Sequence, residues 1–253
     1  FFNGQYSWFR HASSPVTVIA APFLSHESLK VSLYNPLMAS PPMRHDATGK
    51  VNAPAQGLLA GRLHDPFSFL GLHPDGDGWV LRVFRPRANE IRVRRGATWE
   101  NLTRVHPQGI FEWRGQLAPE RPCRLRVYEG DGVREYVDAY CLPPRISGHD
   151  LYLFNEGRLT QAWRTFGAHA MEYDGVSGVR FAVWAPNAER VSVVGEFNGW
   201  DGLSHPMSVH GASGVWELFV PELAPGALYK YEIRNRNSGA VFVKTDPYAQ
   251  VFE

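Results

Sequence analysis

The residues best placed to make chemical contacts form a short turn late in the chain, Phe197-Asn198-Gly199-Trp200-Asp201. Asn and Gly tolerate left-handed backbone conformations, so Asn198 and Gly199 predict a tight turn with Trp200 at the surface. An exposed indole offers a flat apolar face that can stack on another flat partner, such as a sugar ring. The alternative is that Trp200 packs beneath its own loop, and the residues alone leave both interpretations open.

A second group of residues, His64, Asp65 and His73, has the side-chain types that bind metals. Their spacing matches no defined set of zinc ligands. Asp65 followed by Pro66 is instead typical of a helix start, with Asp as the N-cap and Pro in the first helical position. We therefore expect these residues to be structural, and we expect neither a metal ion nor a cofactor.

Composition and charge exclude several classes of protein. The chain has 253 residues, of which 44% are hydrophobic, 13% aromatic and 20% charged, as in globular domains. With 26 basic and 25 acidic residues the net charge is +1, which argues against nucleic acid or an anionic membrane as a partner. No apolar run reaches the roughly 18–20 residues of a membrane helix. Cys123 and Cys141 lack a metal-binding spacing and predict two reduced thiols in a cytoplasmic protein.

An internal repeat defines the architecture. Residues 78–93 (GWVLRVFRPRANEIRV) and residues 178–193 (GVRFAVWAPNAERVSV) match at an offset of 100. After a small shift, Gly109-Ile-Phe-Glu-Trp also matches Gly214-Val-Trp-Glu-Leu. Two copies of one unit therefore follow each other, and we expect Val83 and Val183 to occupy equivalent strands.

Each copy predicts a series of short strands. Val179, Phe181 and Val183 alternate with Arg180 and Ala182, a period of two that directs one set of side chains into a core. Turn-forming residues separate such runs every eight to twelve residues or so, which is typical of an immunoglobulin-like β-sandwich. The expected fold is all-β, with strands near 79–85, 90–94, 110–114, 124–128 and 133–137, and near 179–184, 191–193, 215–220, 228–234 and 241–244.

The elements divide the chain into four parts. We expect an irregular, unassigned segment over 1–55, a first β-sandwich over 56–145, a connector over 146–174 and a second β-sandwich over 175–253. The connector can form one short helix, capped by Asp150 and ended by Gly157. Because the chain starts at Phe1 and its first methionine is Met38, we expect a piece of a longer protein.

Several segments of the second copy resemble the family-48 carbohydrate-binding module. They are, in order, GVRFAVWAPNA (178–188), VSVVGEFNGWD (191–201), GVWELFVP (214–221), YKYEI (229–233) and KTDPY (244–248). Upstream segments resemble the extra amino-terminal domain and inter-domain segment of bacterial 1,4-α-glucan (glycogen) branching enzymes. These are GRLHDPFSFLGLH (61–73), DLYLFNEGR (150–158) and FGAH (166–169).

The resemblance implies an enzyme of glycogen biosynthesis that cleaves α-1,4 glucan and rejoins the piece through an α-1,6 bond. Such retaining chemistry uses two carboxyl groups about 5 Å apart. In this family both belong to a (β/α) barrel that follows the module. We therefore expect no catalytic residue in this chain, and two partners, α-glucan chains and the catalytic barrel of the same polypeptide.

The resemblance also implies a substrate-binding set. In sugar-binding members, the strand of Lys230 donates to glucose hydroxyls, and a second tryptophan follows the last hairpin glycine. Here Phe242 stands in for that tryptophan, so the expected set is Trp200, Lys230, Asn198 and Phe242. In the first copy the corresponding positions fall near Trp99 and on Arg126 or its neighbour, without the Phe-Asn-Gly turn. We therefore expect glucan contact on the second copy only.

Strand patterns assign the remaining conspicuous residues. We expect Trp184 and Trp216 to pack in the core or between domains. Alternation predicts that Arg82, Arg92 and Arg94 share one outer face, which we interpret as a solvated face. The alternative is a basic patch for an anionic partner or for an acidic face of the barrel.

Two other functions remain open from the sequence. The chain could be a free-standing glycogen-targeting module that carries no enzymatic activity, or a purely structural pair of sandwiches without a ligand. A coding sequence that continues past Glu253 into a barrel would favour the enzyme. Binding to immobilised glycogen would separate the two alternatives.

Overall fold

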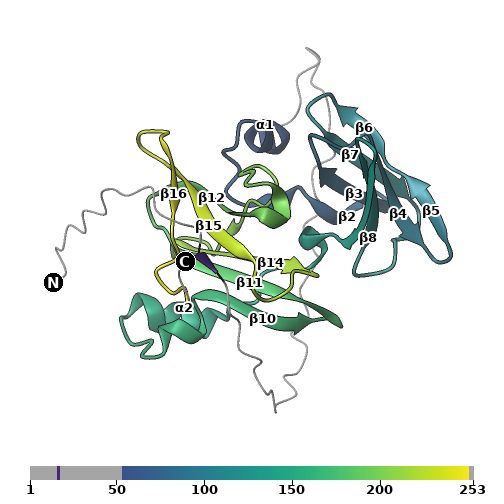
Figure 1. Ribbon diagram of the computed structural model, residues 1–253. Coiled ribbons are helices and arrows are strands. Elements are labelled where there is room, and N and C mark those ends of the chain that lie inside the picture. Colours follow the sequence, from purple (N-terminus) through teal and green to yellow (C-terminus); the bar gives the residue numbers. More distant parts are fainter. Residues whose placement is uncertain (1–15, 18–52, 251–253) are drawn as a thin grey trace.

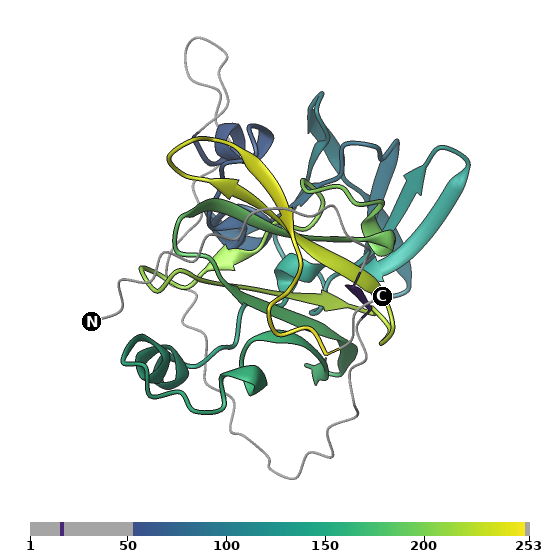
Figure 2. The same cartoon turned by 60° about the vertical axis from the view of Figure 1, so that its left-hand side comes forward.

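The computed structural model describes residues 16–17 and 53–250. Within them the strands form four antiparallel sheets, which build two sandwiches that pack against each other (Figures 1 and 2). We call residues 71–137 the first module and residues 167–244 the second module. The irregular segment expected over 1–55 lies almost entirely outside the described residues.

The first module consists of two sheets with the strand orders β2-β3-β7-β6 and β5-β4-β8-β9. Leu81 and Val83 on one sheet meet Ile91 and Val93 on the other in a shared apolar core. All five predicted strands are present, together with three that were not predicted. The strands are β2 (Gly71–Asp75), β3 (Gly78–Phe84), β4 (Glu90–Arg95), β5 (Thr98–Asn101), β6 (Thr103–His106), β7 (Ile110–Gly115), β8 (Arg124–Glu129) and β9 (Gly132–Val137).

The second module repeats this plan. One sheet has the order β10-β11-β14-β13, and in the other β15 pairs with β12, β16 and the short β1 (Val16–Thr17). The expected connector is too long, because β10 pairs with β11 along its whole length. The strands are β10 (Gly167–Tyr173), β11 (Val176–Trp184), β12 (Ala188–Gly195), β13 (Ser208–Val209), β14 (Val215–Pro221), β15 (Leu228–Asn235) and β16 (Val241–Lys244).

Strand register confirms the repeat. Val83 pairs with Phe111, and Val183 pairs with Trp216, the residue that matches Phe111 in the second copy. The turns after these strands also agree. The Arg85 N–H donates to the Gly109 carbonyl, and the Ala185 N–H donates to the Gly214 carbonyl, both at a distance of 2.8 Å. Val83 and Val183 therefore occupy equivalent strands, as predicted.

The repeat extends further upstream than the sequence comparison indicated. Gly71 and Gly167 both have a positive φ, at 85° and 98°. Two residues later, the Nε2 atoms of His73 and His169 lie 2.8 and 2.9 Å from a carbonyl three residues back. Burial lowers the pKa of both imidazoles. His73 is therefore structural, as expected, and a fixed offset of 100 missed this match because the spacing here is 96 (169 − 73).

The segment between the modules carries α2 (Gly148–Asn155) and the 3₁₀ turn η3 (Ala162–Arg164). The cap predicted at Asp150 is wrong. The Ser147 hydroxyl accepts from the Asp150 N–H at 3.1 Å, so Ser147 is the N-cap and Asp150 lies in the first turn, where a carboxylate also favours the helix dipole. Gly157 follows the helix with a φ of 68°, consistent with its predicted role as the terminator.

The other helical elements connect the sandwiches. They are α1 (Ala53–Leu59), η1 (Pro66–Ser68), η2 (Ala139–Cys141) and η4 (Glu196–Asn198). Asp65 precedes η1 at the predicted N-cap position, but its carboxylate does not cap that turn. It accepts a hydrogen bond from the Ser208 hydroxyl of the second module at 2.9 Å. The neighbouring His64 carbonyl accepts from the Val209 N–H, so this segment joins the modules.

An apolar cluster crosses the boundary between the modules. Phe84 and Ile110 of the first module belong to the same buried cluster as Phe181 and Trp216 of the second. The Tyr140 hydroxyl, from η2, donates to the Pro206 carbonyl at 3.1 Å. The two sandwiches are therefore fixed against each other by buried apolar contacts and hydrogen bonds.

Arg82 does not lie on an outer face, contrary to the prediction. It is fully buried, its guanidinium lies 4.9 Å from the centre of the Phe69 ring, and it forms an ion pair with Glu112 at 2.8 Å. Alternation separates the two faces of a strand but does not reveal that Phe69 covers the second one. On the other sheet, Arg92 is half-buried and Arg94 is exposed.

The two tryptophans of the second sheet differ. Trp216 is 1% exposed in the core, as predicted, whereas Trp184 is 54% exposed and its predicted burial is wrong. Trp184 faces away from the core at the end of β11, where its ring makes a T-shaped contact with Phe154 of α2, with 5.8 Å between the ring centres. Cys123 and Cys141 are both free. None of the described helices has the length and apolar character to span a bilayer.

Candidate functional site

Trp200 lies in a strained turn at the end of β12. After η4, Gly199 and Trp200 adopt left-handed backbone conformations with φ of 65° and 60°, and the Trp200 N–H donates to the Gly195 carbonyl at 2.9 Å. A bulky residue in this region costs roughly 1–2 kcal/mol, and such strain is commonly found at functional sites. The side chain is 40% exposed, so part of the indole face is open to a ligand.

Asn198 holds this turn. Its side-chain oxygen accepts from the Gly195 N–H at 3.0 Å, and its amide nitrogen donates to the Val193 carbonyl at 3.0 Å. The same nitrogen lies 2.9 Å from Nδ1 of His205. These contacts occupy the Asn198 amide, so its geometry suits positioning Trp200 more than touching a ligand.

His205 completes the turn as a neutral imidazole. Its Nδ1 can accept from Asn198 only when it carries no proton. Burial, with a smaller contribution from the Arg85 charge, lowers the pKa of His205 to about 3. The hydrogen bonds that hold the Trp200 turn are therefore intact at neutral pH.

The Trp200 loop crosses the face of the sheet that carries Lys230. Gly202 lies directly against the Glu232 carboxylate, where a Cβ atom would have no room. Arg190 anchors both, since its guanidinium pairs with Glu232 at 2.5 Å and contacts the Gly202 carbonyl. Glu232 and Lys230 are two residues apart on β15 and point to the same side. The loop that carries Trp200 therefore crosses the face of the sheet from which Lys230 projects.

Phe242 lies on the opposite face. It pairs with Ile233 on β15, and residues directly opposite each other in antiparallel strands point to the same side. Ile233 faces the core with Tyr229 and Tyr231, whereas Lys230 faces outward. The predicted second stacking platform is therefore wrong, although Phe242 is 45% exposed. The hairpin between β15 and β16 sets this register, which the residue types did not reveal.

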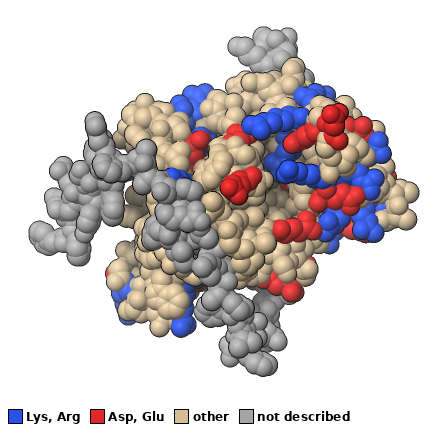
Figure 3. Space-filling model, viewed as in Figure 1, with Lys and Arg blue, Asp and Glu red and all other residues tan. Residues whose placement is uncertain are grey.

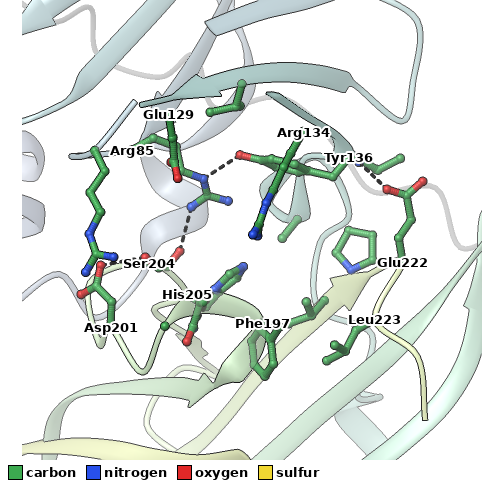
Figure 4. A pocket seen from close by; sticks show the side chains of 18 of the residues that line it. Arg85, Glu129, Arg134, Tyr136, Phe197, Asp201, Ser204, His205, Glu222 and Leu223 are labelled. Atoms are coloured by element: carbon green, nitrogen blue, oxygen red, sulfur yellow. Dashed lines mark hydrogen bonds between the residues drawn. The ribbon is translucent and has the colours of Figure 1, made fainter. Parts of the chain in front are cut away.

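A cleft of about 700 Å³ opens beside the same turn, between the two modules. Glu129 and Arg134 point into it from the first module, and Phe197 and His205 face it from the second (Figure 4). We call it the intermodule cleft. No pattern in the sequence predicts this cleft, because its walls come from segments of both modules that meet only in the folded chain.

Arg85 braces one end of the intermodule cleft. Its Nε donates to the Tyr136 hydroxyl at 2.6 Å, and another guanidinium nitrogen donates to the Ser204 carbonyl of the second module at 3.1 Å (Figure 4). At the other end, the Glu222 carboxylate accepts from Arg124 at 2.6 Å and from the Val137 N–H at 3.1 Å. Both braces join the modules directly.

The first module presents no comparable site. Trp99 lies on β5, and the Arg126 guanidinium covers its ring at 4.2 Å from the centre. Val93 pairs with Leu125 as Val193 pairs with Tyr231, so the counterpart of Lys230 is Arg124, close to the predicted Arg126. Basic and acidic side chains are interleaved over the first module, and no extended patch of one sign appears in this view (Figure 3).

Metal binding has no structural support within the described ranges. Residues 53–250 contain no group of three or more His, Cys, Asp or Glu side chains that could hold a metal ion. His64 and Asp65 instead contact β13 through a backbone carbonyl and a carboxylate, as described above.

Comparison with known proteins assigns both modules. Residues 52–140 match the N-terminal domain of the alpha-1,4-glucan branching enzyme GlgB, and residues 165–249 match carbohydrate-binding module 48, the isoamylase N-terminal domain. A pullulanase from Klebsiella pneumoniae complexed with maltotriose overlaps 72% of this chain and 21% of its own, at 19% identity and a TM-score of 0.30.

Relatives with curated names extend the match across both modules. The 1,4-alpha-glucan branching enzyme GlgB of Nitrosospira multiformis is 57% identical over 201 residues, which is 78% of this chain and 27% of the relative. The enzyme of the same name from Methylobacillus flagellatus is 55% identical over 196 residues, with the same coverage. The chain thus spans about a quarter of the length of these relatives. In sequence and in domain order, it corresponds to the amino-terminal region of the bacterial 1,4-α-glucan branching enzyme family.

Proposed function

We propose that this chain holds α-glucan for a 1,4-α-glucan branching enzyme, and that the second module binds the glucan on the face shared by Trp200 and Lys230. In this role the chain is a non-catalytic region of glycogen biosynthesis that positions glucan and supports a catalytic barrel of the same polypeptide. The names of the relatives support the activity of the whole protein. The free thiols of Cys123 and Cys141 support a cytoplasmic location.

One observation carries the proposal. Trp200 is partly exposed, it is held in a strained turn by Asn198, and its loop crosses the side of the sheet that Lys230 faces. An aromatic face that stacks on a sugar contributes about 1 kcal/mol beyond area burial, and one hydrogen bond contributes about as much. With one platform and one lysine, we expect weak binding, on the order of 1 mM.

Electrophoresis of the chain through a glycogen-containing gel tests this site. We expect Trp200→Ala to abolish retardation and Lys230→Ala to reduce it, with unchanged melting temperatures. Trp99→Ala is the matched control from the first module, and Phe242→Ala is a control from the opposite face of the sheet. If Trp200→Ala is retarded like the unmodified chain, or if Trp99→Ala alone escapes, the site is assigned to the wrong module.

A further inference from the structure

The intermodule cleft adjoins the Trp200 turn but is a separate surface. Gly199, the residue before Trp200, lies on its wall, as do Arg85 and Arg134 of the first module. Its volume of about 700 Å³ lies within the range of roughly 300–1,000 Å³ that is usual for small-ligand sites. The Arg85 and Glu222 braces fix the distance between its walls, so the cleft exists before any ligand binds.

The charges of the cleft suit a neutral ligand. Five carboxylates line it, but Glu135 pairs with Arg126 and Glu222 pairs with Arg124, and neither arginine belongs to the lining. The remaining acidic and basic side chains balance three against three: Glu129, Glu196 and Asp201 against Arg85, Arg87 and Arg134. Neither an anion nor a cation would find a surplus of opposite charge.

Several of these groups are available for hydrogen bonds. Among the described residues, no hydrogen-bond or ion-pair partner occurs for the side chains of Arg87, Glu129, Arg134 and Glu196. Glu129 and Arg134 point into the space between the modules (Figure 4). Carboxylates only accept and guanidinium groups only donate, so a ligand that uses both must itself donate and accept. A hydroxyl group does both, and neighbouring hydroxyls on a sugar ring present such groups in pairs.

We propose that the intermodule cleft is a second α-glucan subsite, which receives the continuation of a chain stacked on Trp200. The assignment of α-glucan as the ligand rests on the function proposed above. Glu129 accepts hydrogen bonds from sugar hydroxyls, and Arg134 donates to them. The two modules together thus form a longer binding track than the second module alone.

Chain-length dependence tests the cleft. Binding of maltotriose and of maltoheptaose to the 253-residue chain is measured by titration calorimetry. We expect maltoheptaose to bind about tenfold more tightly, because only the longer ligand reaches the cleft. The double variant Glu129→Ala/Arg134→Ala should lose this advantage and keep the affinity for maltotriose. Trp200→Ala should weaken binding of both ligands.

The double variant Glu156→Ala/Arg158→Ala provides the matched control. It removes the same two charges from exposed positions after α2, outside the cleft, and should behave like the unmodified chain. If the unmodified chain binds both ligands equally, or if the cleft variant keeps the length advantage, the cleft is not a subsite and the Trp200 site stands. If neither ligand binds the unmodified chain, the proposed function fails and the cleft proposal fails with it.

Discussion

The two modules have the same strand pairing, β4 with β8 in the first and β12 with β15 in the second, but the chain that follows β4 differs from the chain that follows β12. After β12, the second module makes the turn of η4, and the loop that follows brings Gly202 onto the outer face of the sheet against Glu232. After β4, the first module turns at Gly96 directly into β5, so Trp99 becomes part of a strand and lies under Arg126. In the same sandwich fold, the loop after this one strand therefore decides whether a tryptophan lies in an exposed turn or within a strand.

The two modules also differ at the position of Lys230. In the second module Lys230 lies on the outer face, whereas its counterpart Arg124 reaches across the module boundary to Glu222 at 2.6 Å. The first module therefore uses this position to hold its neighbour. Under the proposed function, the first module supports the second, and the second binds the glucan.

The largest loss of stability is expected from mutations in the cores of the two modules, where the modules should be most alike. Phe111→Ala and Trp216→Ala remove equivalent core side chains, both 1% exposed. Each should lower the free energy of unfolding by about 3–5 kcal/mol, as measured by urea denaturation. Trp184→Ala is the control and should cost less than about 1 kcal/mol, because Trp184 is 54% exposed. A large effect at only one of the two core positions would show that the modules are not equivalent.

A somewhat smaller effect is expected at the matched glycines. Gly109 and Gly214 have φ of 97° and 73°, and a Cβ at either would collide with the Cα of Pro86 or Pro186. Replacement of either by Ala should cost about 3 kcal/mol, the sum of backbone strain and overpacking. Gly175→Ala isolates the strain, since its φ is 78° but nothing lies near the added carbon, and should cost only about 1 kcal/mol. The measurement is the loss of stability in thermal unfolding. If Gly109→Ala costs no more than Gly175→Ala, the turns at Gly109 and Gly214 are not equivalent.

The smallest of the three effects is a pH dependence that only the second module's loop should show. His205 has a pKa of about 3 in the folded chain and about 6.5 when unfolded, so the unfolded chain takes up the proton first as pH falls. Stability from this group is complete above pH 6.5 and is lost toward pH 3, by about 1.4 kcal/mol per unit, or about 2 kcal/mol at pH 5.

The measurement is the difference in unfolding free energy between the unmodified chain and His205→Asn, at pH 7 and pH 5. A difference is needed because burial raises the pKa of Asp138, to about 6, and of Asp246, which contributes the opposite slope. Those two groups remain in both proteins and cancel. Parallel curves for the two proteins would mean that His205 has the same pKa in the folded chain as in the unfolded chain.

Much of the fold could be predicted from the sequence, because the repeat provides two independent indications of where the strands lie. Alternation located the strands around Val83 and Val183, and the offset between the copies predicted their equivalent pairing. The turn that presents Trp200 was predicted from Asn198 and Gly199, whose conformations are set within a few residues. These features depend on local chemistry, which a sequence displays directly.

The failures arise where a residue's surroundings come from elsewhere in the chain. Alternation could not show that Phe69 covers the far face of β3, so Arg82 was placed in solvent. The face of Phe242 depends on the exact hairpin register, where a slip of one residue inverts every side chain. The intermodule cleft requires knowledge of how two modules meet, which no pattern within either copy contains.

The apolar cluster that contains Phe84, Ile110, Phe181 and Trp216 couples the stability of the two modules. Here, opening either sandwich would expose apolar surface of its neighbour, so the two should unfold in one cooperative transition. A destabilising mutation in the first module should then also destabilise the second, so selection acts on the two modules as one folding unit.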